Sequence, residues 1–537
     1  MAEWHKSFYQ VSENAKKRGL ILYGAGIWGE IAYQLFDLQG VNPICYADDD
    51  INKQGTDYNG TKVLSLAEAA EKYGQAVFVV CVDDYLNADG LQREKRDRML
   101  DNLVKANVYS SDSEIRIKHY VFLLDLEERK NGGYIPKTWS ETDFKWRELR
   151  KIILFNNMSN SGSYYVEQLL DDHPNLLFLP YSASFELVYE RRLKYLQNDE
   201  LLVEIMAQLL GYFHSQYETL DSVGQHRYQK FVVDQNGDFI DDILIDPQRY
   251  LDCLRQQFEG KVELHTYGQL IKILFAAYAN AIGREKDSKE YWIFYHMHLP
   301  NINVTNIVQS FEQDEFDRME NLIVIREPVQ HLYSWIKRFV IKEQNYKAIE
   351  KGALRDILQS ELGMMLEVKN EQQNVRAICF EDLKYRTEDT MKQFCKWLDI
   401  PYCKCMLETT IQGKVIYFPA NTPDGVKYIT GNDTAAVKQT QFRDVLSLWD
   451  EVRLNVIYGN FKVAYGYYTS VPAYNTFESC DWIFKERFSF CDVIENLLDE
   501  KDAESMYDVD AFVKKTYYDY FQRHNGKQTY YRAIKPR

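Results

Sequence analysis

The feature that most constrains the fold is an alternation of short apolar runs and helical patterns between Gly19 and about Tyr120. Runs such as AVFVVCV are long enough for one strand, and amphipathic segments separate them. Because parallel strands need crossover connections, which are usually helices, this alternation predicts a parallel sheet with helices on its faces. We therefore expect an α/β fold whose first domain is doubly wound.

A glycine motif follows the first apolar run. LILYGAGIWGEIAYQLFDLQG places Gly24, Gly26 and Gly29 in the G-x-G-x-x-G spacing, after a predicted strand and at the start of a predicted helix. Bare backbone amides can approach a phosphate there, and Asp48, at the end of the next strand, is in line for a ribose hydroxyl. The same glycines also permit tight strand-to-helix packing. A nucleotide or nucleotide-sugar site and an empty scaffold are both open.

Composition excludes several classes of protein. With 537 residues, 45% of them hydrophobic and 27% charged, the chain is too long for one ordinary core, so we expect two or three soluble domains. The net charge of −16 argues against a general nucleic-acid or anionic-membrane partner. Its start, MAEWHKSFYQ, lacks an apolar signal region, and no apolar run is long enough for a membrane span. Small or neutral partners are expected.

Cysteine spacing and acidic loops give no metal site. The nine cysteines are scattered, and only Cys403 and Cys405 lie close together, which indicates neither a disulfide framework nor a zinc site. A reducing, cytoplasmic compartment fits this pattern best. DQNGDFIDD is acidic, as calcium-binding loops are. Its glycine is at the fourth position instead of the sixth, and no glutamate occupies the twelfth position. An Asn-Gly hairpin is the favoured interpretation.

Composition shifts suggest the domain boundaries. LLDLEERKNGGYIPKTWSETDFKW is charged and contains Gly-Gly and Ile-Pro breakers, as in a connector between domains. We expect a first domain over residues 1–121, a linker over 122–148 and a second α/β domain over 149–470. The last segment, 471–537, has apolar residues at helical spacing and predicts a helical extension.

The second domain opens with a strand and a small polar loop. KIILF runs into NNMSNSGSYYVEQLL, so five small or polar residues precede or begin a helix: Ser159, Asn160, Ser161, Gly162 and Ser163. Their amides, their hydroxyls and the helix dipole suit a dianion. The loop lacks the first glycine and the lysine of a Walker A motif, which disfavours kinase and ATPase chemistry. Plain N-capping by serine or asparagine would explain the same residues.

A second candidate anion site follows a later strand. NLIVIREPVQHLYSWIKRF reads as a buried strand that ends in Arg326, a proline turn at Pro328 and a helix that carries Ser334. An arginine fork together with a hydroxyl makes a phosphate site.

These segments together resemble the sulfotransferases that use 3′-phosphoadenosine 5′-phosphosulfate. In that family a strand-loop-helix holds the 5′-phosphosulfate, and a later strand and turn with the Arg-x-Pro and downstream Ser spacing holds the 3′-phosphate. HLPNI resembles the family's K-T-H-L-P segment, and AICFEDLKYRTEDTMKQFCKWLDIP resembles its strand, Glu-Asp-Leu turn and helix. The likeness spans roughly Lys151 to Gly466.

The first 110 residues or so resemble the small Rossmann-like domains at the front of bacterial sugar-modifying enzymes, such as sialic acid and bacillosamine acetyltransferases.

The resemblance implies transfer of a sulfuryl group to a hydroxyl, with a sugar or glycan precursor as the expected acceptor. It makes His298 the general base by its place in the motif. Glu186 competes for that role, because heparan-type sulfotransferases use a glutamate shortly after the cradle.

Two departures from the family pattern concern charge. The family has lysine or arginine where this chain has Asn160, and lysine where it has His296, so the usual cations on the bridging oxygen are missing. His296 itself is one candidate replacement, and Lys151, Arg150 and Lys427 are others. The alternative is a non-catalytic nucleotide- or nucleotide-sugar-binding protein in glycan assembly that keeps a degenerate sulfotransferase fold.

Overall fold

The computed structural model describes residues 6–82, 91–133, 135, 138, 140–157, 161–179, 185–220, 226–228, 233–238, 240, 245–286, 290–297, 311, 315–337, 375–422, 425–430, 444–469, 481–495, 508–523 and 532–534. Their contacts divide the chain into two compact units, and each unit is assembled from separate stretches of sequence. Unit 1 comprises Met1–Trp146, Glu186–Val232 and Leu244–Lys286. Unit 2 comprises Arg147–Phe185, Val233–Ile243 and Asp287–Arg537.

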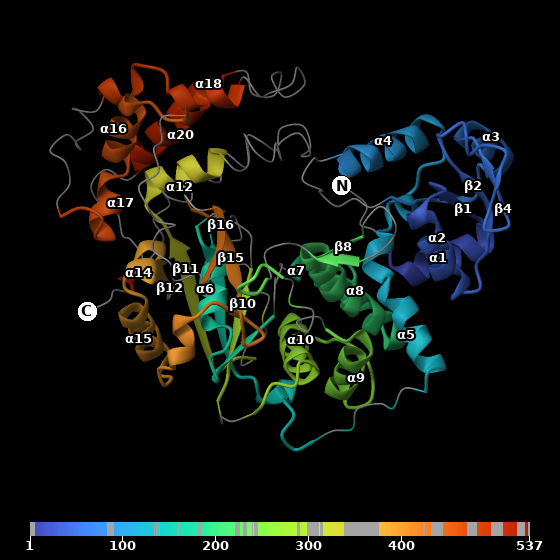
Figure 1. The fold of residues 1–537 in the computed structure, drawn as a ribbon, viewed down its shortest axis with the longest axis horizontal. Coiled ribbons are helices and arrows are strands. Elements are labelled where there is room, and N and C mark those ends of the chain that lie inside the picture. The colour runs from blue at the N-terminus through green and yellow to red at the C-terminus, as the bar shows by residue number, and fades with distance from the viewer. Residues whose placement is uncertain are drawn as a thin grey trace. The chain divides into compact units, whose positions relative to one another are not determined.

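Unit 1 contains the predicted parallel sheet (Figure 1). Its strand order is β3-β4-β2-β1-β5, and every pair is parallel except β3 with β4. The strands are β1 (Leu20–Tyr23), β2 (Pro43–Ala47), β3 (Asp57–Tyr58), β4 (Thr61–Leu64) and β5 (Val77–Val80). The helices of this part are α1 (Phe8–Arg18), α2 (Ile27–Asp37), α3 (Leu66–Tyr73) and α4 (Leu91–Lys105). The expected α/β class is confirmed.

Helices from later in the chain complete unit 1. They are α5 (Phe122–Asn131), α7 (Glu186–Arg191), α8 (Asn198–Tyr217), α9 (Pro247–Phe258) and α10 (Tyr267–Ala281). Two differences from the expected boundaries follow. The start of the expected linker forms helix α5. Its residues Phe122, Leu123 and Leu126 are buried, so this segment is part of a domain core and not a connector. The helices between residues 186 and 286, expected in the second domain, belong to unit 1.

A buried ionic network shows why α8 belongs to unit 1. The carboxylate of Glu204 is fully buried and pairs with Arg192 at 2.7 Å. It also accepts hydrogen bonds from the Phe8 amide at 3.1 Å and the Tyr120 hydroxyl at 2.9 Å. Tyr120 is thereby bonded to α8, a helix that begins almost eighty residues later in the sequence.

Unit 2 is built on a second parallel sheet (Figure 1). Its order is β17-β12-β11-β6-β10-β7, and all of these pairs are parallel. The strands are β6 (Lys151–Asn157), β7 (Leu176–Phe178), β10 (Trp292–His296), β11 (Arg318–Ile325), β12 (Val375–Cys379) and β17 (Arg532–Ala533). The helices that follow individual strands are α6 (Ser163–Leu170), α12 (Pro328–Trp335), α14 (Phe380–Tyr385) and α15 (Thr387–Leu398).

The C-terminal helices are part of the same unit. They are α16 (Leu448–Ile457), α17 (Gly459–Ala464), α18 (Ser489–Glu495) and α20 (Val509–Arg523). Leu332 and Trp335 of α12 share one buried cluster with Leu454, Phe488 and Tyr517. Within the predicted last segment the structure has the helices α18 and α20, and they share a core with α12. The chain also returns to the sheet as β17, which the sequence analysis did not predict.

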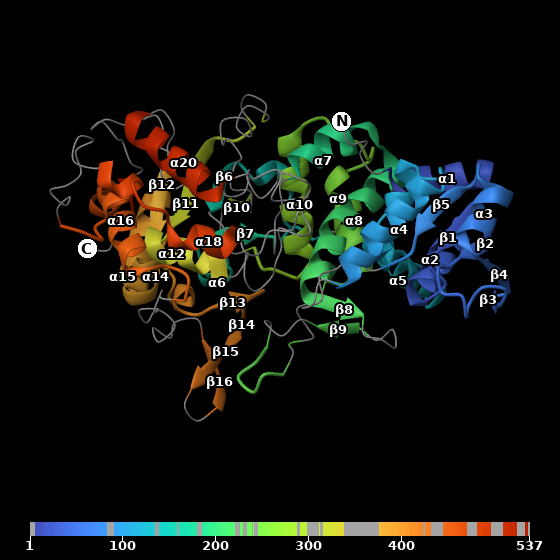
Figure 2. The same ribbon diagram turned by 90° about the horizontal axis from the view of Figure 1, so that it is seen from above.

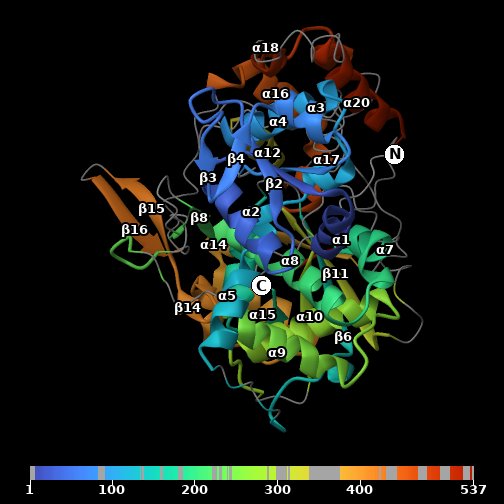
Figure 3. The same ribbon diagram turned by 90° about the vertical axis from the view of Figure 1, so that its right-hand side faces the viewer.

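Two hairpins extend unit 2. They are β13 (Thr410–Ile411) with β14 (Lys414–Val415), and β15 (Tyr417–Thr422) with β16 (Gly425–Thr430). The second hairpin extends away from the β6 sheet (Figure 2, Figure 3). The predicted Asn-Gly turn is present, with the Asp234 carboxylate accepting from the amides of Asn236 at 2.8 Å and Asp238 at 3.0 Å. Its Val233 pairs with Tyr417 of β15.

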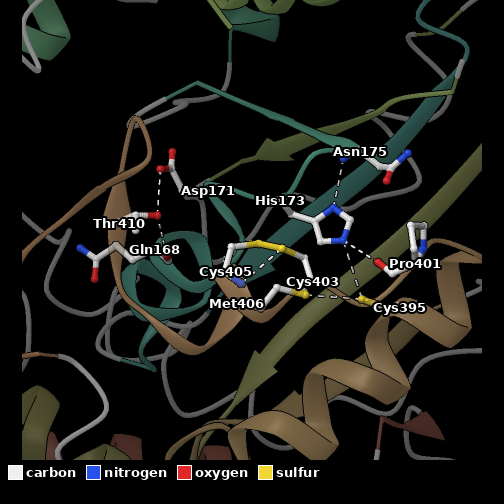
Figure 4. The surroundings of a disulfide bond; sticks show 10 residues. All are labelled: Gln168, Asp171, His173, Asn175, Cys395, Pro401, Cys403, Cys405, Met406 and Thr410. Carbon is white, nitrogen blue, oxygen red and sulfur yellow. Dashed lines mark hydrogen bonds between the residues drawn. A yellow bond between two sulfur atoms is a disulfide. The ribbon is translucent and has the colours of Figure 1, made fainter. Parts of the chain in front are cut away.

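The structure contains a disulfide between Cys403 and Cys405 (Figure 4). The sequence analysis left these two cysteines unpaired. The turn that enters the short helix Lys404–Leu407 places their Cα atoms 5.3 Å apart, a separation that a disulfide spans.

Within the described part of the chain, no helix combines the length and the apolar character needed to cross a membrane.

Candidate functional site

The candidate site lies at the carboxyl edge of the unit 2 sheet. From β6 the chain first builds one side of the sheet, with β7 and β10, and then crosses to the other side, with β11 and β12. The topological switch point is therefore between β6 and β11, and in open α/β sheets ligands bind at such points. The two predicted phosphate segments follow β6 and β11 directly. These two strands are paired neighbours in the sheet.

Gly162 sets the geometry at the start of α6. Its φ is +95°, a left-handed conformation that favours glycine, and it is the N-cap residue of the helix. A side chain at this position would overlap the ring of Phe380 in α14. Ser161 and Ser163 on either side are buried. The N-cap residue is thus a glycine, which has no side chain to cap the helix. Ser159 and Asn160 lie outside the described residues.

Arg326 follows the end of β11 and lies over the same aromatic ring. Its guanidinium carbon is 5.1 Å from the ring centroid of Phe380. Phe380 therefore contacts both predicted phosphate segments, Gly162 on one and Arg326 on the other. Pro328 begins α12, and Ser334 lies near the end of that helix, half-buried.

Two carboxylates surround Arg326, and the sequence analysis missed both. The Glu381 carboxylate accepts from the Glu327 amide at 3.0 Å and from the Tyr467 hydroxyl at 2.6 Å. Burial raises the pKa of Glu381, against smaller opposing effects from Tyr467 and Arg326. Burial lowers the pKa of Arg326, whereas Glu381 and Glu327 raise it. The charge of the arginine is thus partly balanced before any ligand arrives.

A buried lysine completes this cluster. Lys462 of α17 forms an ion pair with Glu327 and is only 4% exposed. Glu327 in turn caps α12 by accepting from the Gln330 amide at 2.7 Å. Nothing in the local sequence of α17 indicates this role, because the contact depends on the packing of a helix more than a hundred residues beyond Glu327.

His296 is at the carboxyl edge as well. It ends β10, the other neighbour of β6, and is paired in register with Phe155. Its Nδ1 lies 2.9 Å from Oε1 of Glu167 in α6, and both side chains are buried. Glu167 was missed, although its position four residues after Ser163 puts it on the same face of the helix as the cradle.

The other predicted catalytic residues are not brought together by the described structure. His298 lies outside the described residues. Glu186 begins α7 in unit 1, where burial and the nearby Glu190 raise its pKa.

Most proposed replacement cations lie elsewhere. Lys151 is paired with Glu290 at 2.5 Å and Arg150 with Asp317 at 2.6 Å, both at the amino end of β6. This end is roughly 20 Å from the cradle, given the rise of a strand. Lys427 is exposed on the β15–β16 hairpin. The ion pairs of Lys151 and Arg150 at the amino end of β6 exclude both residues as partners of an anion in the cradle. Of the four proposed replacement cations, His296 lies at the carboxyl edge of the sheet.

A buried lysine that the sequence analysis overlooked lies on α14. The Nζ atom of Lys384 is 3.7 Å from the ring centroid of Tyr165, in the first turn of α6. The residue is 9% exposed. Its position adds a second cation near the start of α6.

The glycine loop of unit 1 is a separate candidate site. Gly24 has a φ of +120°, and a side chain there would lie 2.7 Å from the Cys81 carbonyl oxygen, while one at Gly29 would overlap the Gly24 carbonyl. Packing alone therefore requires these two glycines. A side chain at Gly26 would meet nothing within 4 Å, so the fold itself does not require this glycine. Open space at that position suits the approach of a phosphate.

Asp48 contacts the same loop instead of standing free at the strand end. Its carboxylate accepts from the Ala25 amide at 2.7 Å and from the Asp50 amide at 2.9 Å. Lys53 lies 3.2 Å from the same carboxylate and donates to the Ala25 carbonyl at 2.8 Å. A ligand phosphate would have to share or displace the Ala25 amide.

Comparison with solved structures gives distant likenesses to sulfotransferase domains. A sulfotransferase domain from the curacin biosynthetic pathway is 15% identical, with 48% of this chain and 77% of that chain covered and a TM-score of 0.25. The sulfotransferase domain of the Synechococcus PCC 7002 olefin synthase is also 15% identical, with 59% and 97% covered and a TM-score of 0.27. No family model and no curated protein matches the chain. At these values neither likeness assigns an activity to this chain.

Proposed function

We propose that this protein is a sulfotransferase that moves a sulfuryl group from 3′-phosphoadenosine 5′-phosphosulfate to a hydroxyl of a sugar or glycan precursor. One observation carries the proposal. The two predicted phosphate segments follow adjacent parallel strands at the switch point of one sheet, and Phe380 contacts both Gly162 and Arg326. The motifs alone would allow these segments to lie apart.

The proposed chemistry assigns a role to each segment. The loop from Ser159 to Ser163 binds the 5′-phosphosulfate through amides and hydroxyls, and Arg326 with Ser334 binds the 3′-phosphate. The acceptor oxygen attacks sulfur, the bond from sulfur to the bridging phosphate oxygen breaks, and the acceptor proton passes to a base. His298, two positions beyond β10 in the sequence, is the proposed base, and Glu186 is the second candidate.

The proposed sugar acceptor is argued from unit 1, and the proposed cytoplasmic location from cysteine usage. A nucleotide sugar at the loop of Gly24, Gly26 and Gly29, with Asp48 beside it, would bring a glycan precursor to the same chain. We place the protein in the cytoplasm on the basis of cysteine usage, because the described cysteines other than Cys403 and Cys405 are buried and form no disulfide.

Binding of the product nucleotide tests the proposal on the whole chain. We expect 3′-phosphoadenosine 5′-phosphate to stabilise the protein by about 2.7 kcal/mol at a hundred times its dissociation constant. Arg326→Ala should remove most of this gain. Arg150→Ala is the matched control, because it removes an arginine at the opposite end of the same sheet and should leave the gain unchanged.

Turnover is tested with the phosphosulfate donor and a panel of sugar, nucleotide-sugar and phenol acceptors, by measuring release of the bisphosphate. His298→Ala and Glu186→Ala separate the two candidate bases, since loss of a general base costs about 10² to 10⁴ in rate and leaves donor binding nearly unchanged. If wild type binds the bisphosphate but transfers to no acceptor, the non-catalytic alternative replaces the enzyme. Absence of bisphosphate binding overturns the sulfotransferase proposal.

A further inference from the structure

None of the three described cradle residues, Ser161, Gly162 and Ser163, is a cation, and Lys384 of α14 lies over the ring of Tyr165, one turn into α6. Ser161, Gly162 and Ser163 offer hydroxyls and amides at the start of α6. One turn further along the same helix, about 6 Å by the helical rise, the carboxylate of Glu167 is buried. A dianion in the cradle would therefore lie close to a negative charge that water does not screen. Such an arrangement is unfavourable unless the carboxylate is neutralised.

His296 is placed to neutralise it. Its Nδ1 is 2.9 Å from the Glu167 carboxylate, and the histidine and glutamate are 2% and 9% exposed. Because the partner is a carboxylate, which only accepts, Nδ1 carries a proton. The charge of the imidazole then depends on whether the ring also carries a proton on Nε2. Histidine is the side chain that exchanges such a proton between about pH 5 and 8.

We propose that the His296–Glu167 pair takes up a proton when a dianion occupies the cradle, so that an imidazolium held by Glu167 adds positive charge beside the cradle. The inference rests on the proposed function, because it takes the start of α6 as an anion site. It also names what stands in for the missing lysine: a charge that depends on protonation.

The groups around the ring are consistent with this role. Glu167 faces His296 from α6, and β6 presents the ring of Phe155 at 4.9 Å between centroids. Tyr295, the preceding residue of the strand, faces the opposite side of the sheet, where its hydroxyl accepts from the Phe185 amide. The approach of an anion to the neighbouring cradle favours the protonated form, so proton uptake and anion binding should be coupled.

A second buried histidine in unit 2 shows the contrasting case. The Nδ1 of His173 accepts from the Asn175 amide at 3.1 Å, and Nε2 lies 2.9 Å from the Pro401 carbonyl (Figure 4). An amide must donate and a carbonyl must accept, so this ring carries its proton on Nε2 and is neutral. Backbone groups on both ring nitrogens thus fix the protonation of His173, whereas the Nδ1 partner of His296 is a carboxylate, which favours the imidazolium. His173 is the matched control.

The test is calorimetry of anion binding to the whole chain in buffers of different ionisation enthalpy, between about pH 6 and 8. Two probes are used, 3′-phosphoadenosine 5′-phosphate and inorganic sulfate. Sulfate remains a dianion over this range, so a proton taken up with it comes to the protein. For wild type we expect uptake approaching one proton per sulfate, and an affinity that falls up to about tenfold per pH unit toward high pH.

Two variants assign the proton. His296→Asn should bind sulfate without proton uptake and with an affinity that does not change with pH. Glu167→Gln should move the fall in affinity to lower pH, because the imidazolium loses its partner. His173→Asn should keep the wild-type uptake. The wild-type measurement needs no variant, so a variant that fails to fold leaves the test intact.

The outcomes separate this inference from the proposed function. Bisphosphate binding with no proton uptake in wild type, or with an uptake that His296→Asn retains, overturns the inference and leaves the sulfotransferase proposal standing. Sulfate binding with His296-dependent uptake but no bisphosphate binding supports the inference and overturns the sulfotransferase proposal. If neither anion binds, both are wrong.

Discussion

Gly162 matters both for the backbone conformation at the start of α6 and for the proposed anion site there. Its positive φ and the overlap of any side chain with Phe380 make Gly162→Ala unfavourable twice over. We expect a loss of more than about 1 to 2 kcal/mol, the usual cost of a left-handed residue alone, and loss of stabilisation by the bisphosphate. Thermal melts with and without the nucleotide measure both effects.

Gly40→Ala is the control for this change. Gly40 has a φ of +67° with nothing within 4 Å of an added side chain, so it tests the backbone term by itself. If Gly162→Ala loses no more stability than Gly40→Ala and still responds to the nucleotide, Phe380 does not constrain the cradle as we describe.

Glu381 gives a prediction about pH at the residue scale. Burial raises its pKa, so the folded protein holds this proton more tightly than the unfolded chain. The resulting stabilisation is fully present below about pH 4.3, the ordinary value of a glutamate, and is lost as pH rises through the raised folded value. Glu381→Gln should lack this fall in urea-unfolding measurements over that range.

The same substitution should also affect the neighbouring arginine. Removing a negative charge beside Arg326 should tighten binding of the bisphosphate at neutral pH, which calorimetry would detect. Unchanged affinity would mean that no charge on Glu381 acts on the bound nucleotide.

At the scale of elements, the loop that enters α2 can be probed cleanly. Because a Cβ atom at Gly26 meets nothing within 4 Å, Gly26→Val should leave unit 1 folded, at a cost of about 1 kcal/mol for replacing a glycine N-cap by valine. If the loop binds a nucleotide or nucleotide sugar, the variant should lose that binding without unfolding, as seen by thermal shift. Gly29→Ala, which overlaps the Gly24 carbonyl, should by contrast destabilise unit 1. A wild-type chain with no response to any nucleotide would identify the loop as a scaffold.

At the scale of the whole molecule, the interleaved units predict how fragments behave. A fragment of residues 1–121 lacks α8, so Phe8 and Tyr120 lose the Glu204 carboxylate that they both contact. We expect this fragment to melt well below the corresponding transition of the whole chain, or to show no cooperative transition by circular dichroism. Glu204→Gln in the whole chain should lower the same transition. A fragment that melts as the intact chain does would show that the first sheet folds independently of α8.

What the sequence by itself determined is local. The alternation of apolar runs and helices predicts the parallel sheets, the glycine at 162 marks the turn into α6, and Pro328 marks the start of α12, because strand length, φ and the missing proline amide are set by residues next to one another. The sequence analysis made no prediction of which strands lie beside β6; the family resemblance implied only that the two phosphate segments bind one nucleotide.

Only the tertiary structure decided which distant segments meet. The pairing of His296 with Glu167, the contact of Phe380 with both Gly162 and Arg326, and the return of the chain as β17 each join residues separated by more than fifty positions. The membership of α8 in unit 1 is of the same kind. Local patterns carry no record of such contacts, because burial of a charge or of an aromatic ring is favourable only after the partner segment has been packed against it.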